Sequence, residues 1–345
     1  MKKSNLNMIS LFLWLILVLP LAACGQPNTA SPKAQPANVQ PNDSAYPVTI
    51  NNYDASENIV TYTYKKSPGK VVITHPGATE LLLELGLEDR ILATVAPYGA
   101  PLPRIADKYA KLPILKAQYN PSQEELLEMQ PDLIISWVHQ FSSNAIGYVK
   151  TWNERGVGTF IMQSTLTKSK PTIENVVYTC ISDLGKIFGI QNQTDLYIQD
   201  LKNRITHVEK AVKNVEQKKT VIVLQDHFNG TFSLYDSRYL INNVIDIAGG
   251  INLCETPASF IGAEKVLAFD PDFIVFVSIN KADNTKDQTD AQAINSLQEV
   301  KALQSMRAIQ KGHIINLPFF TVNNGGVRTI DSIEKIAREL YPEKF

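Results

Sequence analysis

Aromatic and basic side chains gather directly after the β-strands that the sequence predicts. Three of the five histidines, His75, His139 and His227, occupy such positions. The carboxyl ends of parallel strands share one edge of a sheet, and ligands bind in the crevice outside that edge. We therefore expect these side chains to line a binding cleft. The candidate ligand-binding residues are Tyr98, Tyr119, Trp137, His139, Phe141, His227, Phe228, Phe319, Phe320 and Arg328.

The types of these residues suit a large metal complex. Aromatic faces stack on planar or catecholate groups, and Arg328 can pair with an anionic complex. Alternatively, each aromatic residue packs within its own loop, and Arg328 is a surface charge beside a helix. A bare Zn²⁺ or Mn²⁺ is the second ligand class, with His75, His139 and His227 as its imidazole ligands. Against a bare ion, no fourth metal ligand stands out in the sequence.

Neither catalysis nor nucleic-acid binding is supported by the sequence motifs. The chain has no G-x-S-x-G nucleophile elbow, no P-loop and no G-x-G-x-x-G after a first strand. Its 33 basic and 34 acidic residues balance, and no block of Lys and Arg stands out, so we expect no nucleic-acid partner. The sequence indicates a binding protein and not an enzyme.

The elements that position these residues follow a repeated α/β pattern. The segments EELLEMQPDLIIS (124–136) and EKVLAFDPDFIVF (264–276) each place a glutamate seven residues before a Pro-Asp, with a helix before it and a strand after it. Strands that alternate with helices are typical of parallel sheets. We therefore predict an α/β fold with two Rossmann-like lobes, each built on a parallel sheet. The lobes are expected at 48–168 and 194–345, with the ligand cleft between them.

A single long helix is predicted to join the two lobes. Between Lys170 and Ile190 the apolar residues recur at the 3.6-residue period of an amphipathic helix. Thr172 can cap its start, and Gly189 is placed to end it in a left-handed turn. Roughly 17 helical residues span about 25 Å. Residues 169–193 are therefore interpreted as a rigid bridging helix.

The N-terminal part of the chain has the composition of targeting segments. Lys2 and Lys3 precede an apolar run at about 8–21, and small residues follow, as in a secretory signal peptide. Residues 24–47 are rich in Pro, Asn, Gln, Ser and Ala, which is typical of a disordered tether. We expect a signal peptide at 1–23 and a flexible tether at 24–47.

Several stretches of the chain resemble a known family of transport proteins. The tetrad LAAC (21–24) resembles the lipobox at which bacterial lipoproteins are cleaved and lipidated. From Ser67 to Glu343 the chain is similar to the substrate-binding lipoproteins of ABC importers, of the type with a long helix between two lobes. The stretches that carry this similarity are VVITHPGATELLLELGLEDRILAT, EELLEMQPDLIIS, EKVLAFDPDFIV and GGVRTIDSIEKIARELYPE. Members of that type carry iron–siderophore complexes, haem or cobalamin.

The resemblance implies capture of a metal-containing complex outside the cytoplasm and its delivery to a membrane permease. We expect a ferric siderophore first, with haem or cobalamin as alternatives, and no resident cofactor. Cys24 is the expected lipid attachment site, which would hold a monomeric protein at the cell membrane. Glu124 and Glu264 fall where the family has docking glutamates that meet arginines of the permease, with a simple helix-dipole role as the alternative. Glu80 is assigned a role at a helix start only.

Two further cysteines, Cys180 and Cys254, leave two alternatives open. They could pair in an oxidising compartment, or both could remain buried thiols. The spacing between them does not decide.

Overall fold

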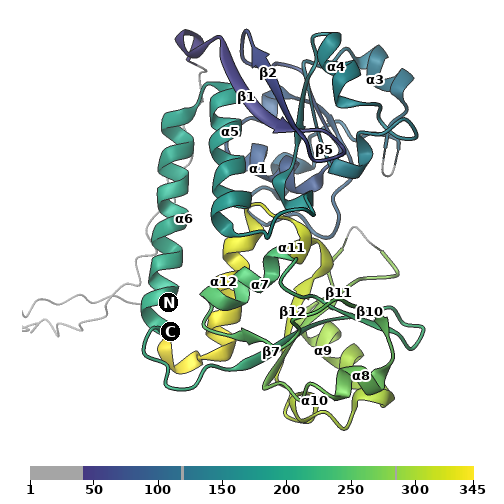
Figure 1. Cartoon of the computed structure of the whole chain (residues 1–345), viewed down its shortest axis with the longest axis vertical. Helices are drawn as coiled ribbons and strands as arrows, with labels where there is room; N and C mark the ends of the chain where they lie inside the picture. The colour runs from purple at the N-terminus through teal and green to yellow at the C-terminus, as the bar shows by residue number, and fades with distance from the viewer. Residues whose placement is uncertain (1–41, 118–119, 284–285) are drawn as a thin grey trace, which may run out of the picture. The chain divides into compact units, whose positions relative to one another are not determined.

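The computed structural model describes residues 42–117, 120–283 and 286–345 (Figure 1). These residues belong to one of the two compact units into which the chain divides, Pro36–Phe345. Cys24 and Tyr119 lie outside the described residues, and so do the predicted signal peptide and nearly all of the predicted tether. Among the described residues, no helix combines the length and the apolar character that crossing a membrane requires.

The first sheet has four strands in the order β4-β3-β5-β6, all parallel as predicted. Every residue of β3, β5 and β6 is buried, as expected where helices cover both faces of a parallel sheet. The strands are β3 (Val71–Ile73), β4 (Ile91–Thr94), β5 (Leu133–Ser136) and β6 (Gly158–Ile161). The accompanying helices are α1 (Pro76–Glu84), α2 (Ala106–Tyr109), α3 (Gln123–Met129) and α4 (Val149–Glu154).

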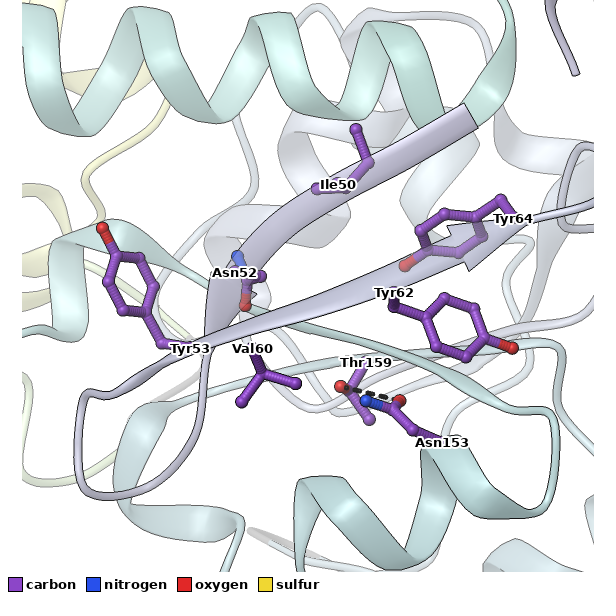
Figure 2. A pocket seen from close by; sticks show the side chains of 8 residues that line it. All are labelled: Ile50, Asn52, Tyr53, Val60, Tyr62, Tyr64, Asn153 and Thr159. Atoms are coloured by element: carbon purple, nitrogen blue, oxygen red, sulfur yellow. Dashed lines mark hydrogen bonds between the residues drawn. The ribbon is translucent and has the colours of Figure 1, made fainter. Parts of the chain in front are cut away.

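A hairpin of β1 (Val48–Tyr53) and β2 (Ile59–Tyr64) precedes this sheet and protects its edge. Asn52 accepts a hydrogen bond from the backbone N–H of Ile161 at 2.7 Å and donates one to the carbonyl of the same residue at 3.2 Å. The amide side chain thereby pairs with β6 as a neighbouring strand would. Figure 2 shows the small cavity of about 10 Å³ beside Asn52, which has room for about one water molecule.

The second sheet is mixed, which differs from the predicted parallel sheet. Its order is β10-β8-β7-β11-β12, with β9 paired to β7. Strands β7, β9, β11 and β12 are parallel, whereas β8 and β10 run antiparallel to their neighbours. A short turn, 227–231, joins β7 to β8, and so short a connection permits only antiparallel pairing. The strands are β7 (Thr220–Asp226), β8 (Phe232–Leu234), β9 (Ile251–Asn252), β10 (Ala258–Ile261), β11 (Phe273–Ser278) and β12 (Ile314–Pro318).

Helices pack on the second sheet and close the chain. The last of them, α12, contacts α7 and also α6, the helix that leads into this half of the molecule. Together with two separate sheets, this arrangement gives the two-lobed α/β fold that the sequence predicts (Figure 1). The helices are α7 (Leu240–Ile247), α8 (Ala263–Leu267), α9 (Asp290–Gln298), α10 (Arg307–Gln310), α11 (Phe319–Asn323) and α12 (Arg328–Leu340).

The predicted bridging segment is helical, but its first six residues, Ile173–Tyr178, form a π-helix. An α-helix, α5 (Thr179–Phe188), follows, and Gly189 ends it with φ 69° as predicted. Thr172 caps the start in a reciprocal pair of hydrogen bonds with Asn175. The wider π turn is held by Thr179, whose backbone N–H and hydroxyl both donate to the carbonyl of Glu174. Helix α6 (Gln191–Val212) then returns beside α5 (Figure 1).

Both described cysteines are buried free thiols, so the thiol alternative holds and the disulfide alternative does not. Cys180 lies on the inner face of α5 with its Sγ 3.7 Å from the Sδ of Met162. Cys254 follows β9 and contacts the carbonyl of Thr256. Burial raises the pKa of each thiol, which keeps them protonated.

Candidate functional site

The loops at the carboxyl edges of the two sheets meet each other. Ser164, which follows β6, donates a hydrogen bond to the carbonyl of Asn324, which follows β12, at 3.4 Å. Gly325 lies so close to Ser164 that a Cβ at the glycine would overlap the serine side chain. Tyr98, after β4, and Phe320, after β12, have ring centroids 6.4 Å apart. The edges that the sequence assigns to a ligand cleft therefore face each other.

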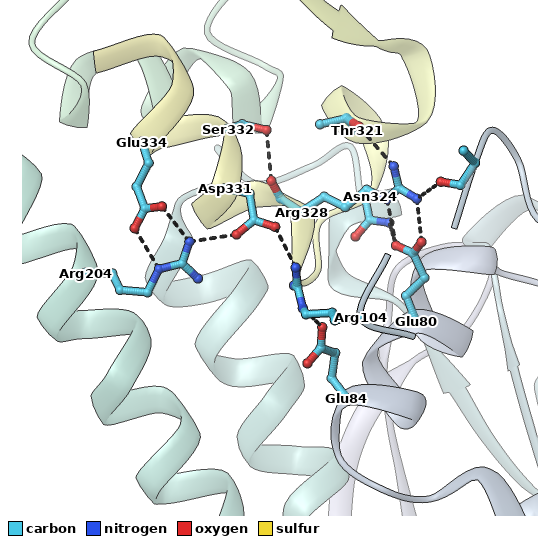
Figure 3. Close-up of polar contacts among 11 residues, drawn as sticks. Glu80, Glu84, Arg104, Arg204, Thr321, Asn324, Arg328, Asp331, Ser332 and Glu334 are labelled. Carbon is cyan, nitrogen blue, oxygen red and sulfur yellow. Dashed lines mark hydrogen bonds and ion pairs between the residues drawn. The ribbon is translucent and has the colours of Figure 1, made fainter. Parts of the chain in front are cut away.

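A buried ion pair spans these edges (Figure 3). Arg328 of α12 donates two hydrogen bonds to Glu80 of α1, from Nη2 to Oε1 at 2.5 Å and from Nε to Oε2 at 2.8 Å. The two residues are 5% and 1% exposed, respectively. Asn324 also donates to Glu80, at 3.2 Å, and Arg328 donates to the carbonyl of Ala100. Arg328 is therefore buried and is not a surface charge beside a helix, which was the alternative expectation. Glu80, expected only to start a helix, also pairs with Arg328 of the other lobe.

A second, more exposed set of charges connects the same elements (Figure 3). Arg104 pairs with Glu84 of α1 and reaches Asp331 of α12 at 3.3 Å. Arg204 of α6 pairs with the same Asp331 and with Glu334, each at 2.7 Å. Helix α12 is therefore fixed by charge contacts both to α1 of the first lobe and to α6.

The predicted site residues of the first lobe divide into exposed and core positions. Trp137 is half-buried, with its Nε1–H donating to the carbonyl of Thr74 at 3.2 Å and its ring 4.2 Å from that of His75. His139 is exposed, and its ring centroid lies 5.9 Å from that of Trp137. Phe141 is fully buried in the core of the first lobe, which is the packing role given as the alternative.

His75 is a buried, neutral imidazole. Its Nδ1 accepts a hydrogen bond from the backbone N–H of Ala78 at 3.3 Å and caps α1. Burial lowers the pKa of His75 to about 3. No group of three His, Cys, Asp or Glu side chains in the described part of the chain is placed to hold a metal ion. His75, His139 and His227 do not form such a group, so the bare-ion alternative lacks its predicted ligand set.

The other predicted site residues of the second lobe lie in the loop after β7 and in α11, the helix that directly follows β12. His227 is half-buried and hydrogen-bonds through Nε2 to Ser233 Oγ at 2.8 Å. Phe228 is 43% exposed. Phe319 is half-buried, whereas Phe320 is buried with its ring centroid 5.4 Å from the Arg328 guanidinium carbon.

A cavity of about 260 Å³ lies between the loops after β6 and those of the second lobe. Its most polar element is Arg238, which is held on one side by Asp236, a buried carboxylate 2.9 Å from Nη2. The guanidinium is still half-exposed, and the ring of Tyr239 lies 5.8 Å from it. The residues that line the cavity are Ser164, Thr165, Leu166, Thr167, Pro171, Arg238, Tyr239, Leu240, Val322 and Gly325.

Sequence reasoning missed Arg238 and Tyr239, because the candidates were chosen from residues that follow parallel strands. Arg238 and Tyr239 follow β8, which is antiparallel. The available signal was the run Asp236-Ser237-Arg238-Tyr239 between a strand and a helix, where polar loop residues commonly carry function.

Glu124 and Glu264 occupy equivalent places in the two lobes. Each lies in the first turn of its helix, α3 or α8, and is exposed. Neither forms an ion pair within the described residues. The aspartates of the two Pro-Asp pairs, Asp132 and Asp272, are equivalent too. Asp132 accepts hydrogen bonds from the backbone N–H groups just before β3, and Asp272 accepts one from the backbone N–H of the first residue of β7.

Comparisons with known proteins identify relatives of the whole chain. The uncharacterized ABC transporter substrate-binding lipoprotein YvrC of Bacillus subtilis (strain 168) is 23% identical over 340 residues, covering 96% of this chain and 98% of the relative. A periplasmic binding protein from Veillonella parvula DSM 2008 is 25% identical with a TM-score of 0.73, over 86% of this chain and 92% of that structure.

An ABC-type Fe³⁺-hydroxamate transport system protein from Saccharomonospora viridis DSM 43017 has the same fold, with a TM-score of 0.68 and 18% identity over 85% of this chain and 99% of that structure. The family model described as periplasmic binding protein matches residues 71–320, which include both sheets and the predicted bridging helix. The chain therefore belongs to the periplasmic binding protein family.

Proposed function

We propose that the protein is the extracytoplasmic substrate-binding component of an ABC importer. Its cargo is a metal-containing complex, a ferric siderophore first, with haem or cobalamin as the alternatives. The family match and the description of the Bacillus subtilis relative as an ABC transporter substrate-binding lipoprotein support this role. On this proposal, Cys24 carries the lipid that anchors the protein to the cell membrane.

The cavity between the lobes is the observation that carries the proposal. Loops from both lobes line its volume of about 260 Å³, so a ligand there contacts both halves. Binding sites of proteins are mostly apolar with a few placed polar groups. Leu166, Leu240 and Val322 supply the apolar part here, and Arg238 supplies the charge.

The chemistry of the cavity suits an anionic complex. Asp236 accepts three hydrogen bonds from Arg238 and so fixes the direction of the guanidinium. Because the group remains half-exposed, it can donate further hydrogen bonds to carboxylate, catecholate or propionate oxygens. Tyr239 and, in the first lobe, Trp137 offer half-exposed rings for stacking.

The delivery step assigns Glu124 and Glu264 to the permease. An ABC importer presents two similar membrane subunits, and two equivalent exposed carboxylates match such a two-fold arrangement. Each glutamate alone contributes little at an exposed site, about 0–1 kcal/mol. Used together, the two contacts fix the orientation of the protein on its partner.

The test begins with the ligand retained by protein purified from its own host. Mass spectrometry and the visible spectrum should reveal a Soret band for haem, a charge-transfer band for a ferric complex, or corrinoid absorption. A colourless divalent ion as the only ligand would contradict the proposal.

The identified ligand is then titrated into single variants, with tryptophan fluorescence as the signal. Arg238→Ala should weaken binding at least about tenfold, since a hydrogen bond to a charged group contributes about 1.5–3 kcal/mol. Arg155→Ala, which removes an exposed cation of the first lobe, is the matched control and should leave affinity unchanged. Equal affinities of both variants and the wild-type protein would show that the cavity is not the site.

A further inference from the structure

A group of exposed aromatic rings lies on the second lobe outside the cavity. Phe260, at the end of β10, is 67% exposed, and Phe228, after β7, is 43% exposed. His227 directly precedes Phe228 and is stacked on Phe260, with ring centroids 4.4 Å apart and planes inclined by 21°. Lys281, after β11, places Nζ 3.2 Å from the ring centroid of Phe228. We call these four residues the aromatic ledge.

The aromatic ledge lies at the sheet edge that faces the first lobe. Strand β7 ends at Asp226, opposite Phe232 at the start of β8, and Phe232 is also opposite Ile261 at the end of β10. The parallel strand β11 ends at Ser278, next to the loop of Lys281. All four ledge residues therefore follow or end strands at one edge, the same edge at which Phe320 approaches Tyr98 of the first lobe.

The rings are held in place and are not loose surface side chains. Ser233 Oγ bonds His227 Nε2 at 2.8 Å and accepts a hydrogen bond from the backbone N–H of Phe260 at 3.3 Å. The backbone is left-handed at both Phe228 (φ 62°) and Phe260 (φ 54°). Such a conformation is uncommon for bulky residues and costs free energy, and strain of this kind clusters at ligand-contacting positions.

The charge on the ledge selects among aromatic ligands. Lys281 forms no ion pair with a carboxylate of the described residues, and its neighbour Asp283 pairs with Lys286 at 3.1 Å. The free face of Phe260 accepts a stacked ring, and the ammonium group of Lys281 attracts negative charge close by. A ligand that satisfies both features has an aromatic ring and an anionic oxygen on the same unit.

We infer that the aromatic ledge is a stacking subsite for a ferric catecholate, in which each iron-binding unit is an aromatic ring with two anionic oxygens. This inference rests on the proposed function and names the class of siderophore that the site takes. Hydroxamate and citrate complexes carry no aromatic ring, so the ledge gives them no stacking energy.

The test titrates three ferric complexes into the purified protein and follows tryptophan fluorescence. The probes are a ferric hexadentate tris-catecholamide, ferrioxamine B and ferric citrate, which differ in aromatic rings and in charge. The catecholamide complex should bind at least about tenfold more tightly than the other two. Phe260→Ala should remove about that factor for the catecholamide complex alone, and Phe260→Trp should restore it.

Two further variants separate charge and surface effects. Lys281→Gln should weaken the catecholamide complex and reduce the dependence of its affinity on salt, whereas Lys281→Arg should retain both. Tyr148→Ala removes an exposed aromatic ring of the first lobe and should change nothing. Circular dichroism and thermal unfolding of each variant report whether it is folded.

The outcomes distinguish this inference from the proposed function. If the protein binds ferrioxamine B or ferric citrate most tightly, or if Phe260→Ala keeps wild-type affinity for the catecholamide complex, the proposed function stands and the stacking subsite is wrong. If Phe260→Ala weakens all three complexes equally, the ring has a structural role and the inference fails. If Phe260→Ala binds normally but supports no uptake, the ledge contacts the permease instead. Binding of none of the ferric complexes would overturn both proposals.

Discussion

At the scale of single residues, the contact between Glu80 and Arg328 has the largest predicted energetic effect. Glu80→Gln removes the hydrogen-bonded counter-charge of the buried guanidinium and leaves only the carboxylate of Asp287, 3.8 Å away. Loss of one partner of a buried pair typically costs about 3–5 kcal/mol of folding free energy. The double variant Glu80→Gln with Arg328→Met removes both charges and should recover part of that loss. Urea unfolding measures the difference.

A partly exposed pair provides the control for this prediction. Glu88 pairs with Lys108 at 2.8 Å, and both side chains are about one-third exposed. Glu88→Gln should therefore cost less than about 1 kcal/mol. Equal losses in Glu80→Gln and Glu88→Gln would mean that the buried pair does not stabilise the two lobes.

Asp272 gives a prediction about pH. Partial burial acts to raise the pKa of this carboxyl, but hydrogen bonds from Thr220 and the charge of Arg307 outweigh it and hold the pKa below its ordinary value. Since the folded pKa is depressed, the stabilisation is present above the unfolded pKa and is lost as the pH falls through the folded value. Asp272→Ala should lose about 1–2 kcal/mol at pH 7, and its difference from the wild type should shrink towards pH 3.

Unfolding in urea at several pH values checks this sign. Asp246→Ala removes an exposed carboxylate that meets Lys218 only at 3.8 Å, and it should follow the wild type throughout. A difference between Asp272→Ala and the wild type that grew on acidification would contradict the assigned direction.

The residue scale also shows what sequence can predict about a site. The equivalent positions of Glu124 and Glu264 at helix starts could be predicted, because the chain repeats the two glutamates and their Pro-Asp pairs at equal spacing. Arg328 was assigned to the ligand, and its buried pairing with Glu80 could not be predicted, because the two residues lie 248 positions apart and neither local pattern contains the other. Phe141 was indistinguishable from a cleft aromatic, since burial depends on how the loop folds back on the core.

At the scale of elements, caps and turns were predictable and the helix type was not. Ser122 with Glu125, and Thr172 with its partner Asn175, cap helices as local hydrogen-bonding rules require. The π-helix at 173–178 buries residues at nearly the same spacing as an α-helix would. The spacing of apolar residues therefore could not distinguish the two helix types. Likewise, β8 and β10 are short, and their direction depends on the turns that join them.

The close packing of α5 on α6 predicts a sensitive glycine. A Cβ at Gly185 would overlap the side chain of Thr194 at the start of α6. Gly185→Ala should therefore lower the free energy of unfolding by about 1–3 kcal/mol, despite the better helix propensity of alanine. Adding Thr194→Ala should restore part of the loss. A stabilised Gly185→Ala protein would show that the two helices separate easily.

At the scale of the whole molecule, transport should separate from ligand binding. Alanine at both Glu124 and Glu264 removes carboxylates without intramolecular ion pairs in the described structure, so ligand affinity should stay constant and each helix should lose at most about 1 kcal/mol. Uptake, or stimulation of the importer ATPase in liposomes, should fall most in the double variant. Glu128→Ala with Glu299→Ala is an exposed control pair. Full uptake by the double variant, or failure to bind ligand, would refute the docking role.

The pairing of Asn52 with β6 has a consequence for shortened forms of the protein. A chain that began after Tyr64 would lack the hairpin, and the backbone N–H and carbonyl of Ile161 would be left at an open sheet edge. Exposed edges of this kind recruit strands from other molecules. Such a fragment should therefore self-associate in size-exclusion chromatography while the longer chain elutes as a single species. The hairpin would then act as a guard against aggregation, separate from any part in transport.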